Sequence, residues 1–186
     1  MAPQVTSAAG FSADVLEFIR LLRRFKVRYL VVGGEAVIFH GYPRLTGDID
    51  FYFQRTAGNV ARLFKALEVF WDNNIPGIKT AKELLEPGII IQFGRPPNRI
   101  DLHGQIDGVS FAAAWKSRVA ARLETRAESI PLFYIGIDAL RRNKRATGRP
   151  RDLDDLEHLV PARRLRRSAP QGPKKVSLGR GRRQRR

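Results

Sequence analysis

One stretch of the chain, residues 33–53, constrains the fold and the chemistry more than any other. It reads GGEAVIFHGYPRLTGDIDFYF and follows a short apolar run, RYLVV, at residues 28–32. An apolar run that ends at a glycine pair is typical of a buried strand that enters a tight turn. Residues 35–42 are then predicted to form a helix that ends before Pro43, because proline is incompatible with the preceding helical turn.

The residues after this helix alternate between polar and apolar side chains. In DIDFYF, residues 48–53, Asp48 and Asp50 share one face of a predicted strand, and apolar side chains occupy the other. The two carboxylates then stand about 6.6 Å apart along the strand. Carboxylates this close repel each other unless a cation lies between them, and oxygen ligands on a rigid strand suit Mg²⁺. The alternation therefore predicts a magnesium site.

Two interpretations of Gly33 and Gly34 are open. A glycine pair after a strand is most often only a tight turn. A strand that enters a helix through such a pair also presents backbone N–H groups at the positive end of the helix, where a phosphate can bind. The acidic strand that follows favours the second interpretation, because Mg²⁺ takes part of its ligands from substrate phosphates.

A glycine pair, a helix and an Asp-x-Asp strand together resemble the core motif of the polymerase-beta-type nucleotidyltransferase superfamily. Within it, residues 33–51 resemble bacterial stand-alone nucleotidyltransferases that include AbiEii-like toxins. The resemblance is strongest over residues 29–53, recurs near Asp101 and over residues 144–159, and covers about the first 160 residues. It implies an Mg²⁺-dependent enzyme that moves a nucleoside monophosphate from a nucleoside triphosphate to an acceptor hydroxyl and releases pyrophosphate.

A second alternating stretch, RIDLH at residues 99–103, places Asp101 on the polar face of another predicted strand. Taken alone, Asp101 is a solvent-facing strand residue. The superfamily resemblance implies instead that Asp101 is the third carboxylate, which completes the metal site with Asp48 and Asp50. In that role it would also assist deprotonation of the attacking hydroxyl.

The resemblance also implies a set of nucleotide contacts. The backbone amides of Gly33 and Gly34 would hold triphosphate oxygens, although many relatives carry Gly-Ser here, so one expected hydroxyl contact is missing. Arg44 and Thr46 match the Arg-x-Thr-x-Asp run of the family and either contact phosphate or hold the loop. Lys144 would approach the phosphates or the transition-state charge. The alternative, in which Lys144 is a surface cation compensated by nearby aspartates, is equally open.

The remaining patterns complete a mixed α+β fold with a central mixed sheet flanked by helices. A capping box of Thr80 and Glu83 predicts a short helix before Pro87. The apolar run at residues 88–93 predicts a buried strand, and Leu153, Leu156 and Leu159 are expected to face the core from the last helix. Further helices are predicted over residues 11–25, 57–71, 110–117, 136–145 and 151–159, and strands over residues 118–125 and 130–135.

The positive charge is concentrated at the end of the chain. The net charge is +16, but residues 161–186 hold eleven of the 34 lysines and arginines and no acidic residue, which leaves +5 for residues 1–160. We therefore expect a nucleotidyltransferase domain at residues 1–160 and a basic, disordered tail at residues 161–186. A flexible polycation binds phosphate backbones, which suggests an RNA partner; a solubilising appendage is the alternative.

Other features exclude several kinds of site. The chain has no cysteine, which excludes disulfides and cysteine-ligated metals, and its three histidines lack the spacing of a zinc site. His40 is expected to pack or cap rather than bind a ligand. No run has the length of a membrane span and no secretory leader is evident, so we expect a cytoplasmic protein that does not enter a membrane.

The acceptor stays open at this point. RNA of the tRNA type, modified by a toxin-like enzyme with an antitoxin-type protein partner, is the first hypothesis. A hydroxyl on a protein or on a small molecule is the second. The alternative from another class is a non-catalytic protein that binds nucleic acid or a protein partner, but a degenerate relative has little reason to keep three carboxylates that repel one another.

Overall fold

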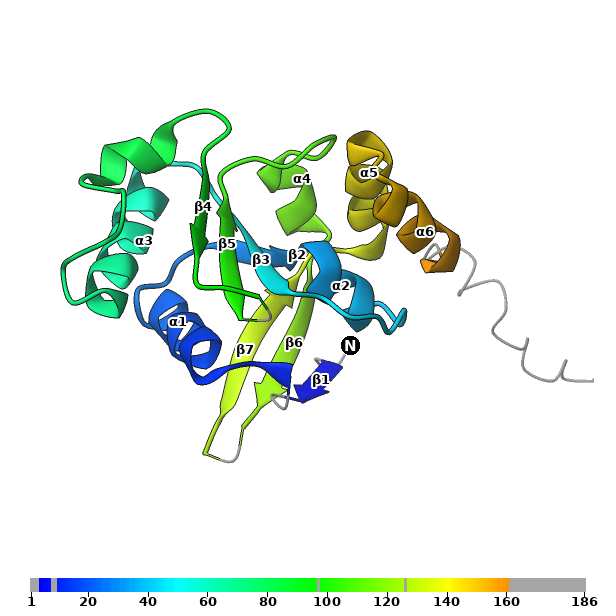
Figure 1. The fold of residues 1–186 in the computed structure, drawn as a ribbon, viewed down its shortest axis with the longest axis horizontal. Coiled ribbons are helices and arrows are strands. Elements are labelled where there is room, and N and C mark those ends of the chain that lie inside the picture. The colour runs from blue at the N-terminus through cyan, green and yellow to red at the C-terminus, as the bar shows by residue number, and fades with distance from the viewer. Residues whose placement is uncertain (1–3, 8–9, 97, 126, 161–186) are drawn as a thin grey trace, which may run out of the picture.

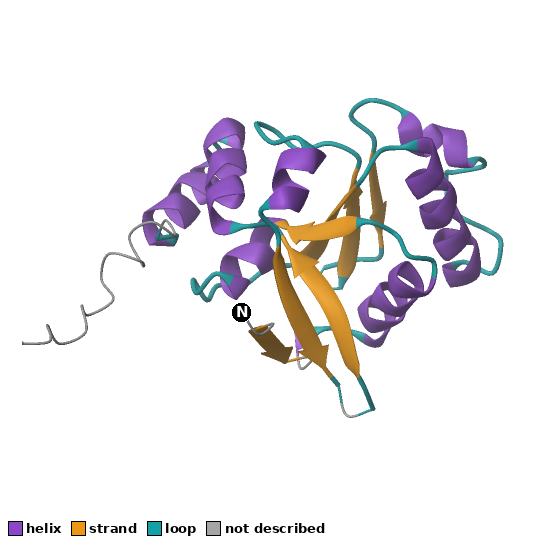
Figure 2. Cartoon of the chain, turned by 180° about the vertical axis from the view of Figure 1, so that it is seen from behind, coloured by secondary structure: helices purple, strands orange, loops and turns teal. Residues whose placement is uncertain are grey.

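The computed structural model describes residues 4–7, 10–96, 98–125 and 127–160. Their centre is a seven-stranded mixed sheet with the order β1-β6-β7-β2-β3-β5-β4. Helices α1 and α3 cover one side, while α2, α4, α5 and α6 lie toward the other (Figures 1 and 2). The predicted fold class, a mixed sheet flanked by helices, is confirmed.

The strands are β1 Gln4–Ser7, β2 Tyr29–Val32, β3 Asp48–Phe53, β4 Ile90–Phe93, β5 Arg99–His103, β6 Val119–Glu124 and β7 Ser129–Tyr134. The helices are α1 Ala13–Arg24, α2 Gly33–Phe39, α3 Ala57–Phe70, the 3₁₀ helix η2 Ala81–Leu85, α4 Phe111–Lys116, α5 Ile137–Thr147 and α6 Pro150–His158.

The core forms where the predicted amphipathic helices meet the apolar face of β3. Ser12 caps α1 by accepting a hydrogen bond from the backbone N–H of Val15, and Phe18 is fully buried below. The Phe18 ring meets Phe51 of β3 and Phe70 of α3 edge to face, with ring centroids 5.7 and 5.2 Å apart. This packing fixes the position of β3, whose opposite face carries the carboxylates.

Two adjacent strands of the sheet, β3 and β5, position the acidic residues. β3 pairs with β2 in the antiparallel sense and with β5 in the parallel sense, and the second pairing places Asp50 opposite Asp101. Period-two alternation then brings the side chains of both residues to the same face. The relative register of β3 and β5, which a single sequence does not reveal, thus joins the two predicted acidic strands into one site.

Three local predictions were wrong. Residues 88–93 do not form a buried strand, because β4 is an edge strand that leaves Ile90 56% exposed. Helix α2 begins at Gly33 and ends at Phe39, since Gly41 adopts a left-handed φ of 101° before Pro43 is reached. Leu153 on α6 is 53% exposed instead of facing the core.

The strand β1, which pairs in parallel with β6, was not predicted. Residues 161–186, for which a disordered basic tail is predicted, lie outside the described residues. Within the described part of the chain, each helix is too short or too polar to cross a lipid bilayer.

Candidate functional site

A cavity of about 510 Å³ lies on the polar face of β3 and β5. The strands contribute its acidic wall, through Asp48, Asp50 and Asp101, and helices α5 and α6 contribute a wall with several cations. The residues that line the cavity include Gly33, Gly34, Arg44, Thr46, Asp48, Asp50, Gln92, Arg99, Asp101, His103, Lys144, Arg149, Arg151 and Asp152. All eight residues predicted to serve the site therefore lie around one cavity.

The three carboxylates and the side chains on them form what we call the strand site: Asp48, Asp50, Arg99, Asp101 and His103. Asp101 is only 3% exposed, whereas Asp48 and Asp50 are partly open to the cavity. Asp101 is thus buried, and not the solvent-facing residue that its own strand pattern allows. A buried carboxylate needs hydrogen-bond donors or cations around it.

Arg99 is the main cation of the strand site. Its Nη2 donates to Asp48 Oδ2 at 2.6 Å and to Asp101 Oδ2 at 2.8 Å, and its Nε donates to Asp101 Oδ1 at 2.7 Å. Gln92 of β4 also donates to Asp101 Oδ2, at 2.9 Å. The hydrogen bonds to Asp101 raise the pKa of the Arg99 guanidinium, so this group keeps its charge.

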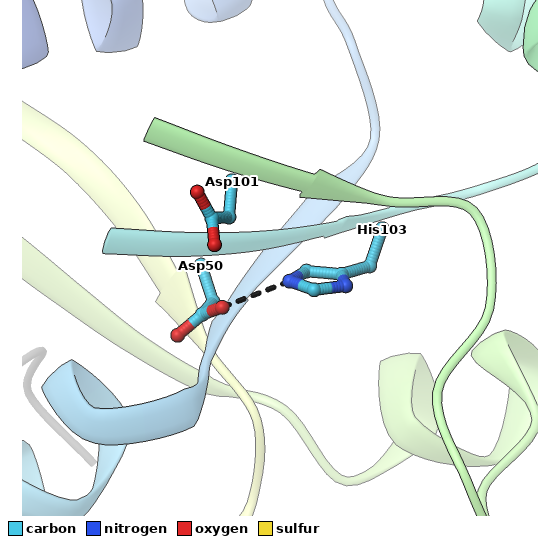
Figure 3. Close-up of side chains that lie close together, drawn as sticks. All are labelled: Asp50, Asp101 and His103. Atoms are coloured by element: carbon cyan, nitrogen blue, oxygen red, sulfur yellow. Dashed lines mark hydrogen bonds and ion pairs between the residues drawn. The ribbon is translucent and has the colours of Figure 1, made fainter. Parts of the chain in front are cut away.

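His103 lies beside the Asp50 carboxylate. Its Nε2 lies 2.8 Å from Asp50 Oδ1, with the ring aimed at that carboxylate (Figure 3). One ligand atom from each of Asp50, Asp101 and His103 lies within 4.8 Å of the others. Three carboxylates face one arginine in the strand site, so two carboxylate charges are not matched by an arginine and remain for a cation.

The glycine pair leaves room for these side chains. Gly33 has a left-handed φ of 62°, and a Cβ there would lie 1.8 Å from Asp50 Oδ2. A Cβ on Gly34 would lie 2.5 Å from Thr46 Oγ1. Position 33 therefore favours glycine for both its backbone conformation and its contacts, and a side chain at position 34 would displace the Thr46 hydroxyl. The serine of the Gly-Ser pair in other superfamily members would meet Thr46 in this chain.

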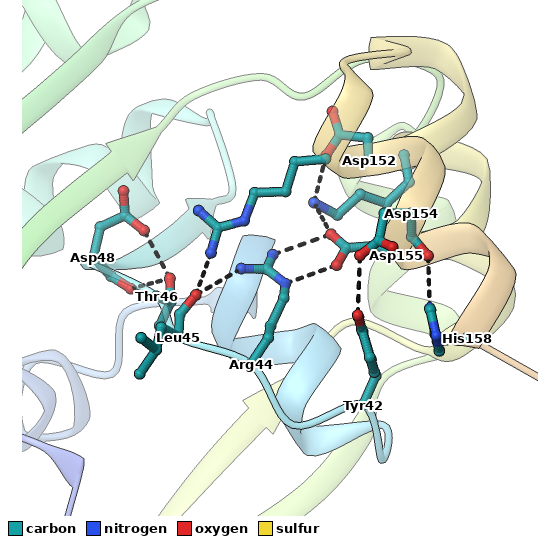
Figure 4. Close-up of polar contacts among 11 residues, drawn as sticks. Tyr42, Arg44, Leu45, Thr46, Asp48, Asp152, Asp154, Asp155 and His158 are labelled. Carbon is teal, nitrogen blue, oxygen red and sulfur yellow. Dashed lines mark hydrogen bonds and ion pairs between the residues drawn. The ribbon is translucent and has the colours of Figure 1, made fainter.

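The loop between α2 and β3 is fixed to the site at two points. Thr46 Oγ1 donates to Asp48 Oδ1 at 3.0 Å, and Arg44 makes two hydrogen bonds, of 2.7 and 3.0 Å, with Asp155 of α6 (Figure 4). Of the two predicted roles of Arg44 and Thr46, these contacts correspond to holding the loop. Both residues also line the cavity, and Nη1 of Arg44 donates to the carbonyl of Leu45 at 3.1 Å.

Lys144 belongs to a second cluster, which we call the helix network: Arg44, Lys144, Asp152 and Asp155. Lys144 is 7% exposed and donates to Asp152 at 2.5 Å and to Asp155 at 2.9 Å. Asp155 is completely buried and also forms an ion pair with Arg44. The compensation of Lys144 by aspartates is therefore present, but Lys144 is a buried residue on the cavity wall and not a surface cation.

Two arginines extend this wall. Arg149 and Arg151 flank the start of α6, line the cavity and are exposed. Arg151 donates to the backbone carbonyl of Leu45, which holds its position without neutralising its charge. The cavity thus has an acidic floor on the strands, and near its helical rim it has two arginines that form no ion pair with a carboxylate in the described part of the chain.

A scan against protein-family models matched residues 13–164 to a family described as nucleotidyltransferase of unknown function (DUF6036). The chain belongs to this family. No curated protein and no solved structure matched the chain. The family agrees with the superfamily that the glycine pair and the acidic strands indicated from the sequence, and it leaves the substrate undefined.

The donor atoms at the strand site are of the kinds that could hold a divalent cation. Oxygen atoms come from two strands of the sheet, a nitrogen atom comes from His103, and the charge left over is that of one dication. The resemblance to the superfamily assigned the metal to Asp48, Asp50 and Asp101. Asp48 lies on the same strand as Asp50, with its carboxylate bound by Arg99 and Thr46, and His103 lies close enough to Asp50 and Asp101 to offer a further donor atom.

Sequence reasoning gave no role to several residues of the cavity. Arg99 and His103 share the polar face of β5 with Asp101, a pattern that is visible in RIDLH. Their partners on β3 are not visible in the sequence, because they depend on the pairing of the two strands.

His40, expected to be structural, donates through Nε2 to the carbonyl of Ile135 at 2.8 Å, and burial lowers its pKa. The prediction for His40 is consistent with this contact.

Proposed function

We propose that the chain transfers a nucleoside monophosphate from a nucleoside triphosphate to an acceptor hydroxyl, with Mg²⁺ bound by Asp48, Asp50 and Asp101. The observation that carries this proposal is the division of one cavity into an acidic floor with two excess negative charges and a cationic rim. Magnesium ions bound to a triphosphate have the complementary arrangement, a cation on one side and anionic phosphates on the other.

The acceptor oxygen would attack the α-phosphorus, the bond from that phosphorus to the bridging oxygen would break, and pyrophosphate would leave. A metal ion held by these carboxylates would stabilise the developing charge and lower the pKa of the attacking hydroxyl. Asp101, held by Arg99 and Gln92, keeps its carboxylate oriented toward this centre and assists removal of the hydroxyl proton. The backbone amides of Gly33 and Gly34 hold triphosphate oxygens beside Asp50.

The cationic residues have a separate task in this proposal. Arg149 and Arg151 bind the β- and γ-phosphates and stabilise the pyrophosphate as it leaves. Lys144 orients the rim through its two aspartates, and its charge adds to the field on the transferred phosphate. Arg44 and Thr46 hold the loop that carries Asp48 in a conformation compatible with this geometry.

RNA of the tRNA type is the acceptor that we propose, in a toxin-like enzyme related to the AbiEii group and controlled by an antitoxin-type protein. The support is the basic segment at residues 161–186, which lies mostly beyond the family match at residues 13–164. We accordingly treat residues 1–160 as the catalytic domain and the segment as an RNA-binding tail in the cytoplasm. A hydroxyl of a protein or a small molecule is the alternative acceptor.

The test is incubation of the full chain with each α-³²P nucleoside triphosphate, Mg²⁺, and total RNA or cell lysate. We expect one labelled band of tRNA size with one nucleotide, and none with Asp50→Asn. Label on a protein band would redirect the proposal to protein modification. If no label appears on any acceptor and no Mg²⁺-dependent nucleotide binding is measured by calorimetry, the transferase proposal is wrong and a non-catalytic binding protein remains.

The tail has its own test. Removal of residues 161–186 should weaken RNA binding by at least about tenfold at low salt and reduce its salt dependence, because eleven cations no longer release counterions. The matched control keeps the length of the tail but replaces its lysines and arginines with glutamine. Equal RNA affinity of the wild-type and glutamine-tailed chains would assign the tail to solubility alone.

A further inference from the structure

We infer that Asp50, Asp101 and His103 form a divalent-cation site with mixed oxygen and nitrogen donors, which prefers a transition-metal ion such as Mn²⁺ to Mg²⁺. The inference deepens the proposed function and rests on it, since the cation would serve the same cavity. The three residues come from neighbouring strands and point to one place (Figure 3). Three carboxylates alone would give a harder site, suited to Mg²⁺.

The separation of the donor atoms matches a metal site. Two ligands at right angles, each about 2.1 Å from a metal ion, are about 3.0 Å apart. His103 Nε2 and Asp50 Oδ1 are 2.8 Å apart, so a cation between them needs no rearrangement of the backbone. The Asp101 oxygen lies within 4.8 Å of both atoms, close enough to join through a small side-chain rotation.

The carboxylates have unused capacity for such an ion. A carboxylate has about four lone-pair directions. Asp101 accepts three hydrogen bonds, two from Arg99 and one from Gln92, and Asp50 shares one contact with His103. Each residue therefore retains a lone pair. Asp48 accepts two such hydrogen bonds, one from Arg99 and one from Thr46, and so keeps the capacity that the proposed function gives it.

The third donor decides the preferred metal. Imidazole nitrogen binds first-row transition-metal ions well, whereas Mg²⁺ prefers oxygen ligands and retains its waters. We expect the wild-type chain to bind Mn²⁺ at least about tenfold more tightly than Mg²⁺, as measured by calorimetry in the absence of nucleotide. His103→Gln should reduce this ratio strongly, because its amide can still donate to Asp50 but has no imidazole nitrogen.

A purely structural His103, one that only donates to Asp50, predicts a different result. Pulsed electron paramagnetic resonance of Mn²⁺ detects a directly bound histidine nitrogen, and ¹⁵N-histidine labelling identifies the signal. We expect this coupling in the wild-type chain and in His158→Gln, an exposed histidine that stacks on Tyr42. We expect it to disappear in His103→Gln.

Two results would overturn the inference: absence of histidine-nitrogen coupling in the wild-type chain with Mn²⁺ bound, or its persistence in His103→Gln. Failure of Mn²⁺ to bind the wild-type chain would do so as well. The wild-type spectrum decides the question even if the variant does not fold. Label transfer with Mg²⁺ alone, together with a spectrum lacking histidine coupling, would remove this inference while the proposed function stands.

Discussion

The strand site and the helix network contain the same kinds of groups but are compensated to different degrees. In the helix network two aspartates meet two cations, Arg44 and Lys144, and Asp155 has no exposed surface. In the strand site three aspartates share Arg99, and both Asp48 and Asp50 remain partly exposed. A balanced, buried cluster stabilises one conformation, whereas an unbalanced cluster at a cavity has capacity for a ligand.

The difference assigns separate tasks to two groups of carboxylates that border one cavity. The helix network joins α5, α6 and the loop before β3, so it determines where Asp48 is held. The strand site provides the groups that bind a cation. Substitutions in the first should therefore change the free energy of unfolding, and substitutions in the second should change metal binding and transfer.

The largest expected effect is on transfer. Asp50→Asn should lower Mg²⁺-dependent turnover at least about a thousandfold, equivalent to about 4 kcal/mol, because it removes a charged metal ligand. The melting temperature should change little, since Asn preserves the shape of the side chain. The measurement is label transfer beside thermal unfolding, with Asp154→Asn as the exposed carboxylate control. Wild-type turnover in Asp50→Asn would remove the strand site from the mechanism.

The next effect is on stability. Asp155→Ala should lower the free energy of unfolding by about 3–5 kcal/mol, because it leaves Arg44 without its buried partner and Lys144 with Asp152 alone. Its neighbour Asp154 is exposed and accepts one hydrogen bond from Tyr42, so Asp154→Ala should cost less than about 1 kcal/mol. Urea denaturation of both variants measures the difference. Similar losses in the two would contradict the distinction between network and surface.

The strand site was largely predictable because its signals are local. Alternation in residues 48–53 and 99–103 assigns each carboxylate to a face, and this requires only the period of a strand. What the sequence lacks is the pairing of β3 with β5. The contact between Asp50 and His103 joins residues 53 positions apart, so the nitrogen donor was invisible even though its strand was predicted.

The helix network was less predictable because its signals are not local. The leucine spacing in α6 predicted an apolar stripe, yet the buried residues of this helix are Asp152 and Asp155. Their burial depends on Lys144 and on Arg44, which lies 111 positions from Asp155. Helical periodicity therefore identified the helix and the burial of Leu159 just after it, but Leu153 is exposed, and paired charges occupy the buried face of the helix.

Two glycine-to-alanine variants test how closely the strand site is packed. Gly33→Ala and Gly41→Ala both place a side chain at positive φ, which should cost each variant about 1–2 kcal/mol of stability. Only the Cβ at position 33 collides with Asp50, whereas position 41 has nothing within 4 Å. We therefore expect divalent-cation binding, measured by calorimetry, to weaken in Gly33→Ala alone. Equal cation affinity in the two variants would show that Asp50 relaxes without loss.

The smallest effect concerns Glu35, a half-buried carboxylate on α2 that contrasts with both clusters. Burial raises the pKa of Glu35, and no cation among the described residues offsets this change. Because the pKa of Glu35 is higher in the folded than in the unfolded chain, protonation of Glu35 stabilises the folded state. This stabilisation is fully present below the unfolded pKa of about 4.3, and it is lost as the pH rises through the pKa of the folded chain.

Glu35→Gln lacks this loss, because its side chain stays neutral at every pH. The stability of Glu35→Gln relative to the wild-type chain should therefore increase between pH 4 and pH 7, as measured by urea denaturation at both values. Glu83 provides the matched control, because hydrogen bonds from the backbone N–H groups of Thr80 and Lys79 lower its pKa. Glu83→Gln should give the opposite trend, with relative stability that decreases as the pH rises. The same sign of change in both variants would show that burial does not govern the ionisation of Glu35. The carboxylate on α2 would then need a cation beside it, as Asp155 has in Arg44 and Lys144.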